Sequence, residues 1–487
     1  MEITLKVNTA HGRKAPGRIE IRADEEGLTP HAGLAITGEL ARRTGLVGLL
    51  DGEIAANRRA AAVKQRERGA SPGELLTAIA ESQLAGAECF TDLEEIRADD
   101  AGAALRAVAE VPSSSSALQI AKRFRRSHLQ RAERAVARAG TKLDEAIGRE
   151  ADEEVTVDLD ASGVEVFGAA KQGAARNRDG QLAYAPYLAT WAERGRALCS
   201  ELYPGNRQML SGPESARIAE RAIDLLPEGH GKVSFRVDSG FYRVELLRRL
   251  RERGATFTVS VPRSSAMWAA LERIAESEWE PATEMAGAEV AETTYSPKAW
   301  KGEPLRLIVR RVALRAADVS PHTRSRRRRT LHPEQLALLE AGEDAGRLYG
   351  YSFILTDRDE DAAWIEHHHR HRAQIEERIR EAKLGVALRN LPSGDINANR
   401  VWLFCSLLAV NLGAMVCDVS PLAGASKAAP KGTPLRRAAK TLRKLLFAVP
   451  ARVIRSGRRM ILRLPAGFRH VDAFAATYRA AWGLPPP

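Results

Sequence analysis

The apolar residues of the N-terminal part follow a helical period. Residues 1 to about 28 read as extended or loop segments (EITLKV, GRIEIRAD), and from Pro30 to about Gly140 apolar residues recur three and four positions apart. The segment LAITGELARRTGLVGLLDGEIAA keeps this spacing throughout, and Ser71 followed by Pro72 has the pattern of a helix start. These patterns predict a mostly helical region over residues 1–150.

After Glu154 the apolar pattern changes to that of strands. EVTVDLDAS alternates, LAYAPYLATWA, VSFRVDSG and ATFTVSVPR look like further strands, and the helical pattern VELLRRLRERG lies between the last two. Strands that alternate with helices predict an α/β core, and residues 151–263 form its first part.

The alternation of strand and helix is interrupted and then resumes. Residues 264–347 combine a helix, strand-like pieces such as PLRLIVRRVAL and the arginine run RSRRRR, so we expect a β-rich region inserted into the core. LYGYSFILTD resumes the core with a strand, and a long helix follows over about residues 361–388. The last core segment therefore spans residues 348–392.

The C-terminal residues 393–487 read as helical again, and basic residues are frequent between positions 427 and 463. Val401 to Val416 is the most apolar stretch. It is shorter than the roughly 20 residues of a membrane span and contains Asn411, so we expect a buried helix and no membrane partner. The four cysteines lie far apart, and the N-terminus lacks the apolar core of a signal peptide. Both features suit a cytoplasmic protein.

Composition adds an indication of the partner. With 44% hydrophobic and 28% charged residues, the chain of 487 residues has the composition of an ordinary soluble protein. Its formal net charge of +12 favours a polyanionic partner, because each Lys or Arg set against a phosphate releases condensed counterions. The arginine-rich helical N-terminal region suits a domain that binds DNA ends, and equally a solvated helical bundle.

Two acidic positions on strands suit metal-dependent cleavage of phosphodiesters, which needs carboxylates converging on one point. Asp158 and Asp160 share one face of the strand that begins at Glu154, and two carboxylates there are costly unless they bind something. Asp238 ends the strand VSFRVD, at the edge where α/β proteins commonly place ligands. The alternatives are a solvated strand edge for the first pair and a turn cap for Asp238.

The third acidic position lies on the predicted helix over residues 361–388. At about 100° per residue, four polar residues share a stripe roughly 60° wide on this helix: His369, Arg372, Glu376 and Lys383. Ile375 and Ile379 fall on the neighbouring stripe, which would pack on the sheet. The alternative is a solvated helix whose charges pair at i,i+4 spacing.

These motifs together carry a resemblance. The spacing His369-x2-Arg372-x3-Glu376-x6-Lys383 resembles the Y-x2-R-x3-E-x6-K signature of DDE transposases of bacterial insertion sequences, with His in place of Tyr. VDLDAS and VDSGFY are similar to the first and second Asp motifs of these proteins. KQGAARN, GELARRTGL and VPSSSSALQIAKRF resemble further stretches of one branch, so the likeness runs from about residue 30 to residue 480.

The resemblance implies an RNase H-like mixed-sheet core with a β-rich insertion and with helical regions on both sides. The catalytic residues and metal ligands that it implies, for Mg²⁺ or Mn²⁺, are Asp160, Asp238 and Glu376. Asp160 is preferred over Asp158 because the first Asp of the family directly precedes a small residue and a hydroxyl, here Ala161 and Ser162.

The resemblance also implies the partners. His369, Arg372 and Lys383 match positions that contact DNA near the cleavage point, and Arg and Lys bind phosphate as a fork and as a point charge. The expected partners are duplex DNA at the terminal inverted repeats of a transposon and at the target, and a second copy of the chain on that DNA. The expected place of action is the bacterial cytoplasm, at the nucleoid.

The arginine run and the type of activity leave alternatives open. We expect the run of four arginines to contact phosphates without regard to sequence, the alternative being a solvated loop: Arg326, Arg327, Arg328 and Arg329. The rivals to a transposase are a DNA-binding protein of transposon origin that has lost catalysis, and a structure-specific nuclease that cuts DNA without joining strands.

Overall fold

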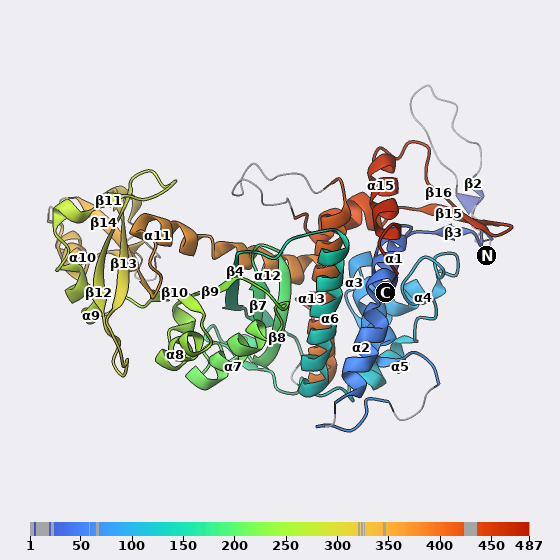
Figure 1. The fold of residues 1–487 in the computed structure, drawn as a ribbon, viewed down its shortest axis with the longest axis horizontal. Helices are drawn as coiled ribbons and strands as arrows, with labels where there is room; N and C mark the ends of the chain where they lie inside the picture. Colours follow the sequence, from blue (N-terminus) through green and yellow to red (C-terminus); the bar gives the residue numbers. More distant parts are fainter. Residues whose placement is uncertain are drawn as a thin grey trace.

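A mixed sheet of 11 strands forms the centre of the protein (Figure 1). The computed structural model describes residues 4–5, 19–20, 24–57, 59–64, 68–168, 170–319, 322, 325, 327–343, 347–422 and 436–486. The strand order is β11-β12-β13-β14-β10-β9-β4-β7-β5, and β6 and β8 also pair with β7. The strands are β4 (Glu154–Ala161), β5 (Val164–Glu165), β6 (Ala175–Arg176), β7 (Leu182–Trp191), β8 (Arg196–Pro204), β9 (Lys232–Val237), β10 (Thr256–Val261), β11 (Glu280–Pro281), β12 (Ala288–Tyr295), β13 (Leu305–Leu314) and β14 (Leu348–Thr356).

Five neighbouring strands of this sheet have the arrangement of an RNase H-like fold. In the order β8-β7-β4-β9-β10, β7 runs antiparallel to both of its neighbours, β8 and β4, and β4, β9 and β10 run parallel to one another. The parallel strands are connected through α7 (Gly212–Ile223) and α8 (Val244–Glu252). The predicted fold class, an α/β mixed sheet with an RNase H-like core, is therefore confirmed.

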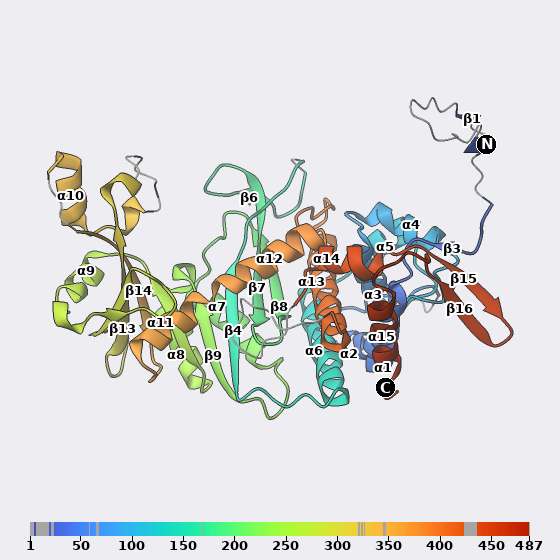
Figure 2. The same ribbon diagram turned by 90° about the horizontal axis from the view of Figure 1, so that it is seen from above.

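The alternation along β4 separates an apolar face of the sheet from a polar one. Val155, Val157 and Leu159 are fully buried in the same core as the apolar residues of α7 and α8. On the other face, the Thr156 hydroxyl lies 3.4 Å from the imidazole of His368 in α11 (Ala362–Arg370). Helices α11 and α12 (Ala373–Gly385) cross this polar face (Figure 2).

The region expected as an insertion extends the core sheet instead of forming a separate one. β13 pairs with β14 along its whole length, and β14 pairs with β10, so β11, β12 and β13 continue the sheet outward. Helices α9 (Ser265–Leu271) and α10 (Pro333–Ala341) belong to the same lobe, which lies at the left of Figure 1. The core strands and this lobe thus share one backbone hydrogen-bond network.

A helical body occupies the other end of the molecule (Figure 1). Its helices are α1 (Leu34–Thr44), α2 (Leu46–Ala55), α3 (Pro72–Ala85), α4 (Leu93–Ala98), α5 (Ser114–Ala121), α6 (Arg126–Ala146), α13 (Ile396–Val419), α14 (Ala439–Leu442) and α15 (Val471–Trp482). Of the helices described, α13 is the one long and apolar enough to cross a membrane, but 94% of its most apolar window is buried inside the protein. It is the core helix that the sequence predicts.

Short strands also occur at the edge of this body. β1 (Thr4–Leu5) pairs with β2 (Ile19–Glu20), and β3 (Leu28–Thr29) pairs with a hairpin of β15 (Ala451–Ser456) and β16 (Arg459–Arg463). The expectation that residues 393–487 are helical throughout is therefore wrong for the hairpin. Gly457, at φ +59°, adopts the left-handed conformation that a two-residue hairpin turn requires.

The single long helix predicted over residues 361–388 is in fact two helices. α11 ends at Arg370, and α12 begins at Ala373. Between them the amide of Arg372 donates to the carbonyl of His369, three residues back, and the amide of Ile375 donates to that of Arg372. These tighter turns rotate the residues before the junction relative to those after it, so His369 does not share a stripe with Glu376 and Lys383.

Candidate active site

Asp160 and Asp238 stand beside each other at the carboxyl ends of two parallel strands. In the register of β4 and β9, Leu159 lies opposite Val237, and the two aspartates are the next residues along. Asp238 is the N-cap of a short 3₁₀ turn, and its carboxylate accepts the amide of Gly240 at 2.8 Å. The carboxylates therefore face the crevice at this edge of the sheet.

Asp158 is held away from that crevice by an ion pair. The guanidinium of Arg236 on β9 donates to both of its carboxylate oxygens, at 2.7 and 2.8 Å, and both side chains are almost fully buried. Arg236 also donates to the carbonyl of His368, at 3.0 Å, and so ties α11 to the sheet. Asp158 thus has a structural partner, whereas Asp160 lies at the open end of the strand.

Helix α12 brings an acid and two cations to the same crevice. Nη1 of Arg372 lies 3.5 Å from Oδ2 of Asp160, and Nη2 lies 3.6 Å from Oε1 of Glu376. Nζ of Lys383 donates to the carbonyl of Gly163, 2.7 Å away, just beyond the end of β4. The side chain of Glu376 is 65% exposed, so it can rotate between the staggered conformations that solvent leaves open to it.

The apolar side of α12 fixes the helix against the protein. Ile375 and Ile379 are buried, as the stripe next to the polar residues predicts. They belong to the hydrophobic core that also contains Tyr184 and Leu188 of β7. Packing on this side therefore orients Arg372 and Glu376 toward the crevice.

An open groove passes over the two aspartates. On the α12 side it encloses about 550 Å³, and its polar lining there includes Asp160, Asp238, Arg372, Glu376, Arg380, Lys383 and Arg389. On the other side a space of about 490 Å³ also borders Asp160 and Asp238, and its lining includes Arg178, Gln208, Met209 and Gly240. Because both spaces share the two aspartates, an extended polyanion can lie across them.

Burial and like charges make Asp160 reluctant to ionise. Burial raises the pKa of Asp160 to about 6, Arg372 opposes the shift, and the carboxylates of Asp238 and Glu376 add to it. Burial lowers the pKa of Lys383, and Asp160 opposes that shift. The pKa values of Asp160 and Lys383 thus both move toward the neutral form, mainly because the crevice withdraws these side chains from water.

A divalent cation fits the chemistry of these donors. No group of three or more His, Cys, Asp and Glu side chains in the described part of the chain is already gathered as a metal site. Arg372 lies between Asp160 and Glu376, and the Glu376 side chain extends into solvent. The donors are nevertheless all carboxylate oxygens, which hard cations such as Mg²⁺ prefer, and a cation would offset the repulsion that the Asp238 and Glu376 carboxylates exert on Asp160.

His369 does not reach the groove, and its expected contact with DNA is corrected. Its side chain is buried, with Nε2 2.8 Å from the Ser260 hydroxyl and Nδ1 2.8 Å from the Thr258 hydroxyl on β10. Burial lowers its pKa to about 3, so the imidazole is neutral. With both ring nitrogens engaged, His369 holds α11 on the sheet.

The arginine run lies in the outer lobe, away from the residues that line the groove. Arg326 is outside the described residues. Arg327 is exposed, with Nη1 3.9 Å from Oδ1 of Asp318, and Arg328 forms an ion pair with Glu340 on α10. Arg329 is exposed and forms no ion pair with any residue that the structure describes. Contact of these arginines with phosphate stays a prediction.

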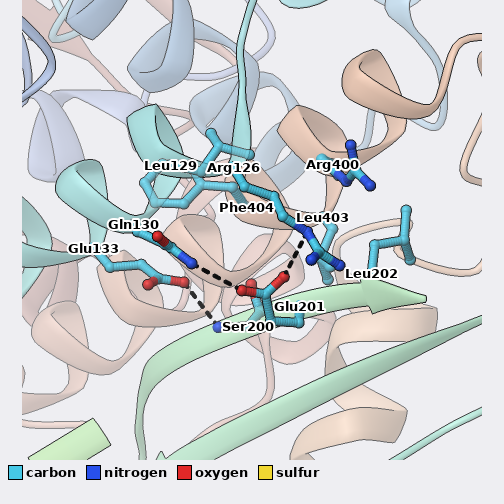
Figure 3. Close-up of a pocket in the computed structure, with 10 residues that line it drawn as sticks. All are labelled: Arg126, Leu129, Gln130, Glu133, Ser200, Glu201, Leu202, Arg400, Leu403 and Phe404. Atoms are coloured by element: carbon cyan, nitrogen blue, oxygen red, sulfur yellow. Dashed lines mark hydrogen bonds and ion pairs between the residues drawn. The ribbon is translucent and has the colours of Figure 1, made fainter. Parts of the chain in front are cut away.

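A second polar cluster joins the helical body to the sheet and is too small for a substrate (Figure 3). Glu201 on β8 contacts Arg126 at 3.1 Å and Gln130 at 3.0 Å, and Glu133 accepts the amide of Ser200 at 2.8 Å. The enclosed cavity is about 20 Å³, which is room for about one water molecule. Burial raises the pKa of Glu133 to about 7. This cluster is a structural junction.

Comparison with known proteins identifies the family. The family model described as "Transposase DDE domain group 1" matches residues 12–481, nearly the whole chain. The protein belongs to this family of DDE transposases. Among solved structures, a cryo-EM structure of a piggyBac transposase synaptic complex with hairpin DNA is similar at a TM-score of 0.40 and 11% identity, over 86% of this chain and 79% of that one. No curated protein matches the chain.

The sequence pattern of this DDE transposase could have revealed some of the groove residues but not others. At 100° per residue, Arg380 falls about 20° beyond His369, at the edge of the predicted polar stripe. The helical period therefore indicates Arg380 as a residue of the same side. Arg178 and Gln208 come from loops beside β7 and β8, and nothing in the local pattern marks them. The partner of Asp158, Arg236, depends on the register between two strands 78 residues apart.

Proposed function

We propose that this DDE transposase cuts DNA at transposon ends and transfers the freed 3′-hydroxyl strand by two-metal-ion chemistry. The observation that carries the proposal is the position of Asp160 and Asp238 at adjacent strand ends, in a groove that Glu376, Arg372 and Lys383 also line. Membership in the family supports the same chemistry. The three carboxylates are the proposed catalytic residues.

Asp160, Asp238 and Glu376 would hold Mg²⁺ or Mn²⁺. When bound, such cations stabilise the attacking and the leaving oxygen of a phosphodiester and lower the pKa of the attacking water. Asp160 must lose its proton to act as a ligand, and its pKa of about 6 places that loss just below neutral pH. Glu376 would turn from solvent toward the two aspartates.

The cations of the groove would bind and orient the DNA. Arg372 contacts Asp160 and Glu376 through separate nitrogens. It could therefore release one of these carboxylates and bind a DNA phosphate in its place while the helix stays where it is. Lys383 is positioned by the carbonyl of Gly163, at the mouth of the groove. Arg380 adds a further charge. Together these side chains would align the scissile phosphate with the two aspartates.

The cellular role follows from this chemistry and from the sequence resemblance. We place the protein in a bacterial insertion sequence, with its terminal inverted repeats and target DNA as partners. Two ends must be processed together, so a homodimer on DNA is the proposed active form. The cytoplasm, at the nucleoid, is the proposed place of action.

A strand-transfer assay tests the proposed function. The full chain is incubated with Mg²⁺, a labelled duplex that carries the repeat flanking its gene, and a target plasmid. We expect nicked ends and joined products, and we expect Asp238→Asn to abolish both while end binding persists. The matched control is Asp179→Asn, an exposed aspartate on the turn before β7. Cutting without joining would identify a structure-specific nuclease, and binding without cutting would identify an inactive derivative.

A further inference from the structure

The β15–β16 hairpin carries arginines and no acidic residue. Its 13 residues, 451–463, include five exposed arginines: Arg452, Arg455, Arg458, Arg459 and Arg463. Arg452 lies 3.3 Å from Glu25. The other four form no ion pair with any residue that the structure describes. Such a concentration of uncompensated charge on a small element is a surface for a polyanion.

One face of the hairpin is open to solvent except at Ile454, which is half-buried. Arg452 lies opposite Arg463, Ile454 opposite Ile461, and Ser456 opposite Arg459, so all six side chains share that face. On the opposite face Leu462 packs against the hydrophobic core of the helical body. The open face therefore presents arginines at both ends, with Ile461, which is 38% exposed, between them.

The dimensions of the hairpin suit a groove of duplex DNA. A strand of 6 residues is about 20 Å long, and two strands lie about 5 Å apart, so the ribbon with its side chains can enter a major groove about 12 Å wide. Guanidinium groups on such a ribbon reach the phosphates on both sides, and an exposed apolar side chain can meet thymine methyl groups.

The path of the chain connects the hairpin with the catalytic groove. The carboxylate of Glu381 on α12 accepts the amide of Ala439, the first residue of α14, at 2.8 Å. The chain then passes from α14 through a short π-helix, Arg443–Phe447, into β15. In Figure 2, α12, α14 and the hairpin follow one another along the molecule, with the hairpin projecting at the end away from the outer lobe. A duplex that leaves the groove along α12 would meet the hairpin.

We propose that the β15–β16 hairpin is a second DNA-binding element, which inserts into a groove of the transposon-end duplex beyond the catalytic groove. The inference rests on the proposed function for the identity of this DNA. It adds a β-ribbon contact in a region whose sequence predicts helices. The opposite explanation is that the arginines only protect β16, an edge strand, from pairing with other chains.

Salt dependence of DNA binding tests this proposal. Fluorescence anisotropy measures binding of the full chain, in EDTA, to a 40-base-pair duplex between 50 and 200 mM NaCl. The test variant replaces by Gln the four arginines other than Arg452: Arg459 and Arg463 on the open face, Arg458 on the turn, and the exposed Arg455 on the opposite face. Four lost phosphate contacts should make the slope of log K against log salt less steep by about 3.6. Between 50 and 200 mM NaCl, the fall in the binding constant should therefore be roughly 150-fold smaller for the variant than for the wild type. Replacing the same four by Lys should restore the slope.

The control variant makes the same change of charge elsewhere. It replaces by Gln four exposed arginines on α7, on α8 and at the C-terminal end of α8: Arg217, Arg248, Arg251 and Arg253. We expect the salt slope of this control to differ from that of the wild type by no more than about 0.9, the contribution of one phosphate contact. An unchanged slope in the hairpin variant, or an equal loss in the control, would overturn the proposal. The proposal would also be overturned if the hairpin variant lost binding to anionic phosphatidylglycerol vesicles but not to DNA. Aggregation of the variant with a normal salt slope would overturn it too.

The result is independent of the proposed catalysis. If the wild type cuts and joins DNA but the hairpin variant keeps the full salt slope, the hairpin proposal alone fails. If the wild type binds DNA with the expected hairpin dependence but never cuts with Mg²⁺, the proposed function fails and the binding element stands.

Discussion

Replacing Asp160 by Asn should stabilise the protein in the absence of metal. Asp160 is largely buried at the end of β4, and burial together with the nearby charges of Asp238 and Glu376 raises its pKa to about 6, against an ordinary value of 3.8. An Asn side chain has nearly the same shape and carries no charge. The substitution therefore removes the repulsion and the cost of burying a charge while keeping the packing.

The magnitude follows from the difference in pKa. Because the folded protein holds this proton more tightly than the unfolded chain, the contribution of Asp160 to stability is fully present below about pH 4 and is lost as the pH rises through about 6. A difference of about two pKa units corresponds to about 3 kcal/mol. Near pH 7.5 the variant should thus exceed the metal-free wild type by up to about 3 kcal/mol in free energy of unfolding.

Urea unfolding in EDTA at pH values from about 4 to 7.5, followed by circular dichroism, measures this difference. The advantage of Asp160→Asn over the wild type should be near zero at the acid end and grow with pH. The control Asp179→Asn should show no such trend, because Asp179 is exposed. Mn²⁺ at about 100 times its dissociation constant should raise the free energy of unfolding of the wild type by about 2.7 kcal/mol, and that of the Asp160 variant by little.

The reasoning would be refuted by an advantage of Asp160→Asn that does not change with pH. A variant less stable than the wild type at every pH would show that Asp160 makes favourable contacts as a carboxylate. Equal stabilisation of both proteins by Mn²⁺ would separate Asp160 from the metal site.

Further substitutions test the neighbouring assignments. Arg236→Met leaves the Asp158 carboxylate buried without its partner, so the free energy of unfolding should fall by about 3 to 5 kcal/mol in urea titrations, and adding Asp158→Leu should recover part of it. His369→Ala should lower the free energy of unfolding by about 1 to 3 kcal/mol, because it leaves two hydroxyls on β10 without a partner. The DNA affinity of this variant in anisotropy titrations should be unchanged. Arg329→Gln should flatten the salt slope of DNA binding by about 0.9, whereas Arg328→Gln should not, because Arg328 already pairs with a glutamate.

The local patterns of the sequence located the acidic residues but not their partners. Alternation along β4 placed Val157 and Leu159 inside and Asp158 and Asp160 together on the other face, as the structure shows. Which of the two aspartates lines the groove depends on Arg236, which stands opposite Asp158 in the register of β4 and β9 and pairs with it. A register between strands far apart in the chain leaves no trace in either strand alone.

The errors arose where tertiary contacts override local propensity. Residues 361–388 contain no Gly or Pro before Gly385, and their helical period runs on without interruption. The break near His371 accompanies the burial of His369 against β10, which fixes α11 independently of α12. The β15–β16 hairpin was missed because its frequent arginines obscure the alternation that Val453 and Leu462 retain.

The most direct test of the metal site compares two adjacent glutamates of α12. Glu376 lines the groove over Asp160 and Asp238, whereas Glu377 is 74% exposed and lies 3.4 Å from Arg380. Single-turnover cleavage of a labelled transposon end is measured with Mg²⁺ for Glu376→Gln and Glu377→Gln. We predict a loss of at least about 100-fold for Glu376→Gln, because even partners of a metal ligand are worth about 10- to 100-fold, and a near-normal rate for Glu377→Gln. Near-normal cleavage by Glu376→Gln would contradict the three-carboxylate site.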